Sequence, residues 1–290
     1  MDAFTQRCAK PQWDGSPSTS LRNIFAPRFG IEITRSIQYR QGSRGTLDVY
    51  RPRTAAPAPI VVFFYGGSWQ GGMKSLYRFL GAALARRGYV AVVPDYRVYP
   101  EVRFPEFLHD AALAVRWSVD HAAWFGGDRS KLFLMGHSAG AYIAAMLAID
   151  RRWLHQAELD PTRDISGLVG VAGPYDFLPL RDETLKIIFG GANQPLTQPI
   201  AHVTSGTPPA LLLTGATDRV VDPGNASRLA ARLQSSGSHA TVVTYPHAGH
   251  FTIMAAFASP LRFLAPALRD TEAFLARVTG RGVAGAEMRA

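Results

Sequence analysis

Short apolar runs alternate with longer mixed segments along most of the chain. The first run, Ile60-Val61-Val62-Phe63-Phe64, has no polar position, which is typical of a strand buried on both faces of a parallel sheet. Further strands are predicted at 89–93, 131–135, 168–172, 210–214 and 240–245. Helices are predicted at 75–87, 105–122, 139–149, 223–236 and 261–277. This alternation predicts an α/β fold with a doubly wound, mostly parallel sheet that carries helices on both faces.

The segments outside this series define the domain boundaries. Residues 31–34 and 46–50 alternate apolar and polar positions, and they predict an antiparallel pair of strands at the N-terminal side. Residues 1–30 contain Pro11, Pro17 and Pro27 and are interpreted as an arm or a cap element. We therefore expect one catalytic domain over 31–280, a small cap insertion at 173–208 with a short helix near 181–189, and a flexible tail at 281–290.

Composition and charge narrow the classes of partner. The 290 residues are 47% hydrophobic, which is enough for a large core, and the formal net charge is +9. The excess arginines are scattered, so neither nucleic acid nor an anionic surface is the expected partner. Cys8 is the only cysteine, and the first residues lack the apolar run of a secretory signal. The sequence thus predicts a cytoplasmic protein without membrane insertion.

The strongest chemical signal is the pentapeptide Gly136-His137-Ser138-Ala139-Gly140. It stands between a predicted strand and an Ala-rich predicted helix, which is the context of a nucleophile elbow. A strained turn would lift the Ser138 hydroxyl out of the backbone, and small flanking residues would let that turn pack closely. The helix that follows would offer free N–H groups to a developing oxyanion. We interpret Ser138 as a nucleophile.

A serine nucleophile needs a base that is oriented by an acid, in the chain order Ser, Asp or Glu, His. Asp218 follows the predicted strand 210–214, and we prefer it to Asp222, which suits the start of the next helix. After the last strand, His250 lies beside a glycine within the loop, and we prefer it to His247 at the loop start. No pair among His109, His121, His155, His202 and His239 has the spacing of a metal site, and neither a metal nor a cofactor is expected.

The loop after strand 60–64 is the second candidate element. Tyr65-Gly66-Gly67-Ser68-Trp69 contains paired glycines that would let the N–H groups of Gly67 and Ser68 turn toward the nucleophile. With the Ala139 N–H, they would form an oxyanion hole. An ordinary Gly-Gly turn is the alternative.

These segments together resemble the bacterial carboxylesterase branch of the α/β-hydrolase superfamily with an HGG-type oxyanion motif. That branch includes hormone-sensitive-lipase-like and feruloyl-esterase-like enzymes, and kynurenine formamidase is related to it. The resemblance rests on Tyr65 to Trp69, Asp95 to Glu101 with Phe104-Pro105, the pentapeptide, Gly215 to Asp218 and Gly249-His250-Phe251. It implies an α/β-hydrolase fold, and a triad of Ser138, Asp218 and His250.

One position departs from that family's pattern, since Tyr65 stands where the family usually has histidine before the glycines. Its hydroxyl either supports the loop or faces the substrate. Trp69, Tyr142 and Tyr175 are further candidates for substrate contacts, and Phe177 and Phe189 belong to the same group. For each of these aromatic residues, packing in the core is an equal alternative.

The leading hypothesis is a serine carboxylesterase that hydrolyses short-chain or aryl esters through an acyl-enzyme on Ser138. An arylformamidase acting on an N-formyl amide would use the same triad. A third reading is a non-catalytic binding protein on this fold, which would not need a base beside its serine. The expected partner is a small-molecule ester, and the sequence is compatible with a homodimer.

Overall fold

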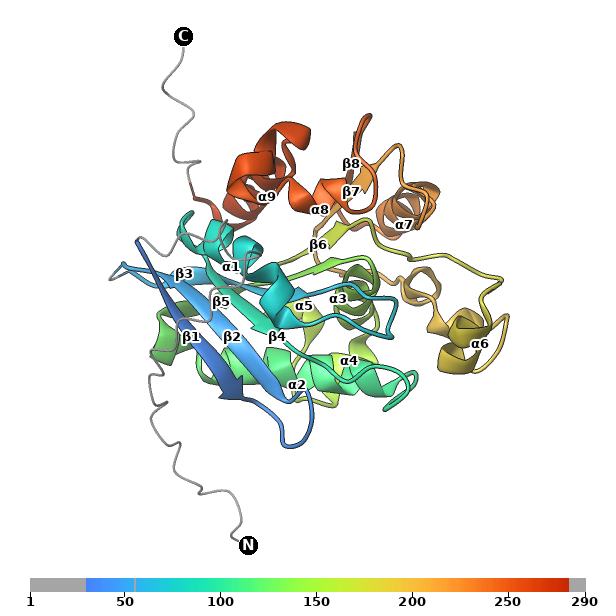
Figure 1. Ribbon diagram of the computed structural model, residues 1–290, viewed down its shortest axis with the longest axis horizontal. Helices are drawn as coiled ribbons and strands as arrows, with labels where there is room; N and C mark the ends of the chain where they lie inside the picture. Colours follow the sequence, from blue (N-terminus) through green and yellow to red (C-terminus); the bar gives the residue numbers. More distant parts are fainter. Residues whose placement is uncertain (1–29, 55, 282–290) are drawn as a thin grey trace, which may run out of the picture.

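The computed structural model describes residues 30–54 and 56–281, and within them eight strands form a single sheet (Figure 1). The strands are β1 (Ile31–Gln38), β2 (Thr46–Pro52), β3 (Ala58–Phe64), β4 (Val90–Pro94), β5 (Gly127–His137), β6 (Gly167–Val171), β7 (Ala210–Gly215) and β8 (Ala240–Tyr245). Their order is β1-β2-β4-β3-β5-β6-β7-β8. The β1–β2 and β2–β4 pairs are antiparallel and all other pairs are parallel, as the sequence predicted.

Helices connect and cover these strands. The α-helices are α1 (Arg78–Ala85), α2 (Glu106–Asp120), α3 (Ala139–Ile149), α4 (Arg151–His155), α5 (Pro161–Asp164), α6 (Glu183–Phe189), α7 (Gly224–Ser235), α8 (Thr252–Ala255) and α9 (Ala267–Thr279). Short 3-10 helices are η2 (Lys74–Tyr77), η3 (Ala122–Phe125), η4 (Pro195–Thr197), η5 (Pro199–His202) and η6 (Ser259–Leu264). Figure 1 shows α1 and α9 above the sheet and α2 with α4 below it.

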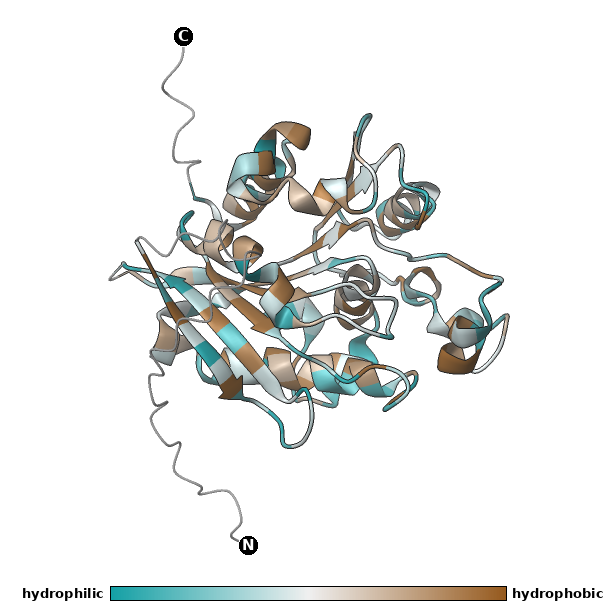
Figure 2. Cartoon of the chain, viewed as in Figure 1, coloured by the Kyte–Doolittle hydropathy of each residue, from teal (hydrophilic) through white to brown (hydrophobic). Residues whose placement is uncertain are grey.

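Burial explains the two strand patterns of the sequence. Every residue of β3, β4, β6 and β7 is buried, because helices cover both faces of the central sheet. Polar and apolar residues alternate along the peripheral strands β1 and β2, as the colours of Figure 2 show. All 11 residues of α3 are buried, which is the expected position for a helix without a polar face.

Some helix boundaries differ from the prediction. The helix predicted at 261–277 is divided into η6 and α9, because Pro266 lies between them and cannot continue a helix. The helix predicted at 75–87 begins as the 3-10 turn η2, and α1 ends at Ala85, three residues before Gly88. Gly88 has φ +81° and closes the turn after α1, where its N–H donates to the Ala85 carbonyl at 3.1 Å.

The order of the strands creates the position for a site. The chain leaves β3 toward β4 on one side and then returns to β5 on the other side of β3. The loops that follow β3 and β5 therefore diverge at the carboxyl edge of the sheet, where α/β proteins bind their ligands. These two loops contain the predicted oxyanion motif and the predicted nucleophile.

The predicted cap, arm and tail lie outside the alternating series of strands and helices. The predicted cap at 173–208 consists of α6, η4, η5 and their connections, and η5 contacts α3. Apart from Gly30 and Arg281, the predicted arm at 1–30 and the predicted tail at 281–290 lie outside the described residues. Within 30–54 and 56–281, no helix has the length and apolar character that crossing a bilayer requires.

Candidate active site

Ser138 occupies a sharp turn between the end of β5 and the start of α3. Its backbone has φ 54° and ψ −124°, a strained conformation for a residue with a side chain. A Cβ on Gly136 would lie 2.1 Å from the carbonyl oxygen of Gly140, and a Cβ on Gly140 would lie 2.0 Å from that of Phe64. The two glycines of the pentapeptide are therefore a steric requirement of this turn.

Three side chains form a hydrogen-bonded line that begins at this serine. His250 Nε2 lies 2.9 Å from Ser138 Oγ, and His250 Nδ1 lies 2.8 Å from Asp218 Oδ2. The other Asp218 oxygen accepts hydrogen bonds from the N–H groups of Val220 and Val221, at 2.8 and 2.9 Å. Because a carboxylate accepts from Nδ1–H, Nε2 carries the lone pair and accepts the serine proton. The line can thus remove a proton from Ser138.

The competing acid and base of the sequence lie elsewhere. Asp222 is exposed, accepts a hydrogen bond from the Gly224 N–H at 3.0 Å and pairs with Arg228 at 3.0 Å. It belongs to the start of α7, as its position in the sequence indicated. His247 is exposed, whereas the histidine three residues later is 5% exposed. The loop after β8 therefore turns one imidazole into the protein and the other outward.

The loop after β3 lies directly against the serine. A Cβ on Gly66 would lie 2.9 Å from the Cβ of Ser138, so only glycine allows this approach. The next two residues have positive φ, 146° at Gly67 and 52° at Ser68. Within the described residues, no hydrogen bond is formed by the N–H groups of Gly67, Ser68 or Ala139. These donors remain free for a ligand oxygen beside the Ser138 hydroxyl.

Tyr65 supports this loop from below. Its ring is fully buried and stacks on Tyr96 with a centroid distance of 4.6 Å. Its hydroxyl accepts hydrogen bonds from Arg44 Nη1 at 3.2 Å and from the Tyr96 N–H at 3.4 Å. Burial, followed by the charge of Asp95, raises the pKa of the Tyr65 hydroxyl. Of the two roles left open by the sequence, these contacts favour support of the loop over contact with substrate.

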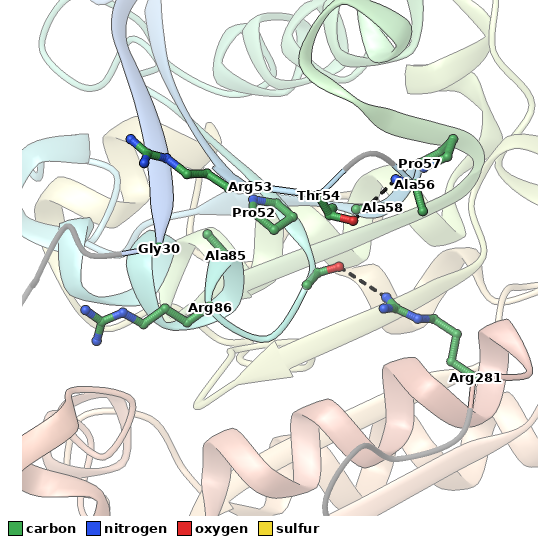
Figure 3. A pocket seen from close by; sticks show the side chains of 11 residues that line it. Gly30, Pro52, Arg53, Thr54, Ala56, Pro57, Ala58, Ala85, Arg86 and Arg281 are labelled. Carbon is green, nitrogen blue, oxygen red and sulfur yellow. Dashed lines mark hydrogen bonds between the residues drawn. The ribbon is translucent and has the colours of Figure 1, made fainter.

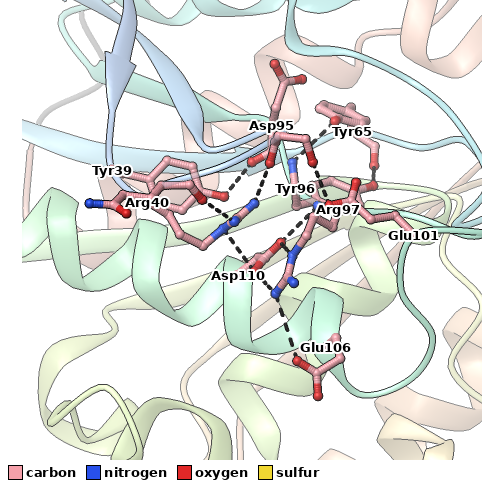
Figure 4. A network of polar contacts seen from close by, with 11 residues as sticks. Tyr39, Arg40, Tyr65, Asp95, Tyr96, Arg97, Glu101, Glu106 and Asp110 are labelled. Atoms are coloured by element: carbon pink, nitrogen blue, oxygen red, sulfur yellow. Dashed lines mark hydrogen bonds and ion pairs between the residues drawn. The ribbon is translucent and has the colours of Figure 1, made fainter.

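A buried ionic network continues beneath Tyr65 (Figure 4). The Asp110 side chain is fully buried and accepts two hydrogen bonds from the guanidinium of Arg97, at 2.9 and 2.7 Å. Arg40 forms a third contact with Asp110, at 3.1 Å. From the same hairpin, the Tyr39 hydroxyl donates to the Asp95 carbonyl at 2.6 Å. The β1–β2 hairpin and the segment after β4 are thus tied together under the oxyanion loop.

Three aromatic candidates for substrate contacts are packed in the core. Trp69 is 3% exposed and meets Phe189 edge to face, with a centroid distance of 4.8 Å. Tyr142 is fully buried, and its hydroxyl donates to the Thr197 carbonyl of the predicted cap at 2.7 Å. Tyr175 is 1% exposed. Core packing, the alternative noted from the sequence, is the role that these contacts favour.

Two residues beside the serine were missed in the sequence. His137 is 3% exposed, its Nε2 lies 3.1 Å from the His250 carbonyl oxygen, and its Nδ1 lies 3.3 Å from the Tyr77 hydroxyl. Burial, together with the smaller effect of the neighbouring His250 charge, lowers the pKa of His137 to about 4. The place of His137 inside the pentapeptide was an available signal, whereas Tyr77 has no local signal.

The cavity in Figure 3 is not this site. It is lined by residues that include Pro52, Ala58 and Arg281, and it lies where β3 begins. That edge of the sheet is opposite to the carboxyl edge that holds Ser138. Among residues 30–54 and 56–281, no group of three or more His, Cys, Asp or Glu side chains has an arrangement suited to a metal ion.

Comparison with known proteins places this geometry in context. The pattern of the BD-FAE family matches residues 47–233. A probable isoprenylcysteine alpha-carbonyl methylesterase of Arabidopsis thaliana is 29% identical over 245 residues, which are 77% of this chain and 52% of that protein. The kynurenine formamidase of Danio rerio is 30% identical over 166 residues, 54% of each chain. The chain thus spans about half the length of these two relatives.

Solved structures agree with the fold. Esterase 2 of Thermogutta terrifontis, in its apo form, has a TM-score of 0.72 and 25% identity, and the match covers 88% of this chain and 97% of that chain. A second structure of the same esterase is described as phosphoramylated by tabun, with a TM-score of 0.70 and 25% identity over 87% of this chain and 96% of that chain. The expected α/β-hydrolase fold is confirmed.

Proposed function

Because the chain belongs to the BD-FAE family, we propose that it is a serine carboxylesterase that forms an acyl-enzyme on Ser138. The observation that carries the proposal is the line from Ser138 through His250 to Asp218, with spacings of 2.9 and 2.8 Å. A nucleophile, a base and an orienting acid in hydrogen-bond reach are what acyl transfer requires. The free N–H groups beside the serine supply the remaining part of such a site.

In the first half of the proposed reaction, Ser138 Oγ attacks the ester carbonyl carbon while His250 Nε2 takes the hydroxyl proton. The negative charge on the carbonyl oxygen is stabilised by the N–H groups of Gly67, Ser68 and Ala139. Asp218 stabilises the imidazolium that forms. The tetrahedral intermediate then expels the alkoxide, which receives the proton from His250 and leaves as the alcohol.

In the second half, water attacks the acyl-enzyme, and His250 accepts its proton. The second tetrahedral intermediate collapses, the Ser138 oxygen leaves and takes the proton back, and the carboxylic acid is released. Both halves use the same base and the same oxyanion donors, so no further group is required.

We propose short-chain or aryl esters as substrates. The segment 173–208 is the element that would cover the carboxyl edge of the sheet, and α6 with two 3-10 turns is its only regular structure. The hydrogen bond from Tyr142 to Thr197 and the packing of Phe189 on Trp69 hold this segment down on the domain. A small, fixed cover favours small acyl groups over long ones. The methylesterase relative, whose name specifies a methyl ester, is compatible with a small alcohol.

An arylformamidase is the second candidate, and the relative that favours it is the kynurenine formamidase. The same serine would attack the formyl carbonyl of an N-formyl amide. A panel of p-nitrophenyl acetate, butyrate and octanoate beside N-formylkynurenine separates the two activities. We expect kcat/KM for acetate or butyrate to exceed that for octanoate and that for N-formylkynurenine by at least about tenfold, or about 1.4 kcal/mol.

Other results would redirect the assignment. A higher kcat/KM on N-formylkynurenine than on every ester would favour the formamidase. Failure of a fluorophosphonate probe to label Ser138 in the wild-type protein, together with no turnover of the panel, would favour the non-catalytic binding protein.

Tyr65→Phe tests the supporting role of this tyrosine. The change removes one hydroxyl, while the ring keeps its stacking on Tyr96 and Arg44 keeps its hydrogen bond to the Gly72 carbonyl at 3.0 Å. We therefore expect kcat on p-nitrophenyl acetate to fall by less than about tenfold, with the fold retained in circular dichroism. A fall of about 10²-fold or more confined to kcat would instead make this hydroxyl an oxyanion donor.

A further inference from the structure

A chain of polar contacts connects the oxyanion loop to the loop of His250, and it passes behind Ser138. The Gly66 N–H points to the Tyr77 hydroxyl oxygen at 3.4 Å. The same hydroxyl lies 3.3 Å from His137 Nδ1. On the other side of the imidazole, His137 Nε2 lies 3.1 Å from the backbone oxygen of His250. Neither Tyr77 nor His137 touches the reacting atoms in the proposed mechanism.

In each of these hydrogen bonds, only one assignment of donor and acceptor is possible. The carbonyl of His250 can only accept, so His137 Nε2 must carry a hydrogen. In a neutral ring, Nδ1 is then an acceptor, and the Tyr77 hydroxyl donates to it. The Tyr77 oxygen keeps lone pairs that accept the Gly66 N–H. Burial lowers the pKa of His137 to about 4, so the ring is neutral near pH 7 and the three directions are compatible.

The elements at the two ends are those whose spacing matters for acyl transfer. Gly66 immediately precedes the free N–H groups of Gly67 and Ser68, and its Cα is packed against Ser138. The side chain of His250 is oriented by Asp218, but the backbone of its loop is held on this side by His137. The His137 ring therefore lies between the oxyanion donors and the base.

The connecting side chains have little freedom. His137 is the last residue of β5, which pairs with β3 on one side and β6 on the other. The Tyr77 ring packs against Phe63, at a centroid distance of 5.2 Å, and against Phe79, at 6.0 Å. A contact between rigidly held groups transmits position, whereas a contact between mobile groups does not.

We propose that His137 and Tyr77 are positioning residues that set the distance between the oxyanion loop and the catalytic histidine. This inference rests on the proposed esterase function, since it concerns the same Ser138 site. Donors placed for an oxyanion act more strongly on the transition state than on the bound ester, so their displacement lowers kcat more than it raises KM.

The test compares Tyr77→Phe, His137→Gln and the double variant on p-nitrophenyl acetate. Tyr77→Phe keeps the ring and removes the central hydroxyl. Glutamine at 137 offers both an N–H and an acceptor oxygen, but it replaces the rigid imidazole that fixes the spacing between the Tyr77 hydroxyl and the His250 carbonyl with a flexible side chain. We expect each single change to lower kcat by about tenfold with KM within about twofold. The kcat of the double variant should lie within about twofold of the kcat of the less active single variant, because both changes interrupt the same chain of contacts.

A second readout separates positioning from simple loss of structure. A short alkylboronic acid binds a serine hydrolase as a tetrahedral adduct, and its inhibition constant should rise by about the same factor as kcat falls. Tyr89→Phe is the matched control, because it also removes one tyrosine hydroxyl. Tyr89 is 3% exposed and lies beside Arg281, away from the site. The control should change neither constant by more than about twofold.

The outcomes are distinct. Unchanged kcat and boronate affinity in Tyr77→Phe and His137→Gln, beside an active wild type, would overturn the inference alone. Multiplying losses in the double variant, or losses of kcat that follow a fall in Tm with no change in boronate affinity, would also overturn it. A wild-type protein with no esterase activity would overturn the proposed function, and this inference with it.

Discussion

Ser138→Ala is expected to lower kcat/KM for ester hydrolysis by about 10⁴-fold or more, as removal of a triad nucleophile does elsewhere. The change deletes only the attacking oxygen. The backbone of the turn keeps its hydrogen bond from the Ser138 N–H to the Val171 carbonyl at 2.9 Å. Its carbonyl still accepts the N–H groups of Ala141 and Tyr142 at 2.9 and 3.1 Å. Steady-state kinetics on p-nitrophenyl acetate measure the loss.

Ser118→Ala provides a control of the same kind. Ser118 is fully buried in α2, and its hydroxyl donates to the Ala114 carbonyl at 2.8 Å, away from the site. This variant should keep kcat/KM within about twofold, so that a loss in Ser138→Ala reports on chemistry and not on a lost buried hydroxyl. Retention of a tenth of the wild-type activity by Ser138→Ala would contradict its role as the nucleophile.

His250→Ala is expected to cost about as much as Ser138→Ala, because the members of a triad act as one unit. Without the imidazole, no group accepts the Ser138 proton, and Asp218 keeps only its hydrogen bonds from the N–H groups of Val220 and Val221. The double variant of Ser138 and His250 should be little worse than either single variant. Kinetics on the same ester, with circular dichroism of each variant, check this.

His247→Ala is the matched control for the base, because it removes an imidazole from the same loop. The side chain is exposed, and we expect kcat/KM to change by less than about threefold. If His247→Ala proved the more damaging of the two, the assignment of the base would be wrong. A large loss in both variants would indicate that the conformation of the whole loop after β8 depends on His247.

The fold could be predicted because its signals are local. The buried strand β3 has no polar position, and α3 has no polar face. The sequence of each element therefore indicates by itself that the element is buried. Two helix boundaries failed where a 3-10 turn replaced the first turn of the predicted helix. At Pro266, a helical pattern of apolar positions continued across a residue that ends the helix.

For the site, the sequence by itself determined the proposed nucleophile. The glycines around Ser138 are required by steric contacts within five residues and with the adjacent strand, and such contacts leave a short motif in the sequence. Positions after strands favoured Asp218 over Asp222 and His250 over His247, and the two favoured residues are the ones that lie in line with Ser138. Only the fold, however, brings His250 to Ser138, because the two residues are 112 positions apart.

Only the tertiary structure decided the direction of the Tyr65 hydroxyl and the contacts of Tyr77 and His137. The Tyr65 hydroxyl is hydrogen-bonded to Arg44, which lies 21 residues earlier in the turn between β1 and β2. The Tyr77 hydroxyl contacts the His137 ring, 60 residues later in the sequence. A buried polar side chain points toward the groups with which it forms hydrogen bonds. Those partners are supplied by other elements, and therefore no pattern within one segment of the sequence specifies them.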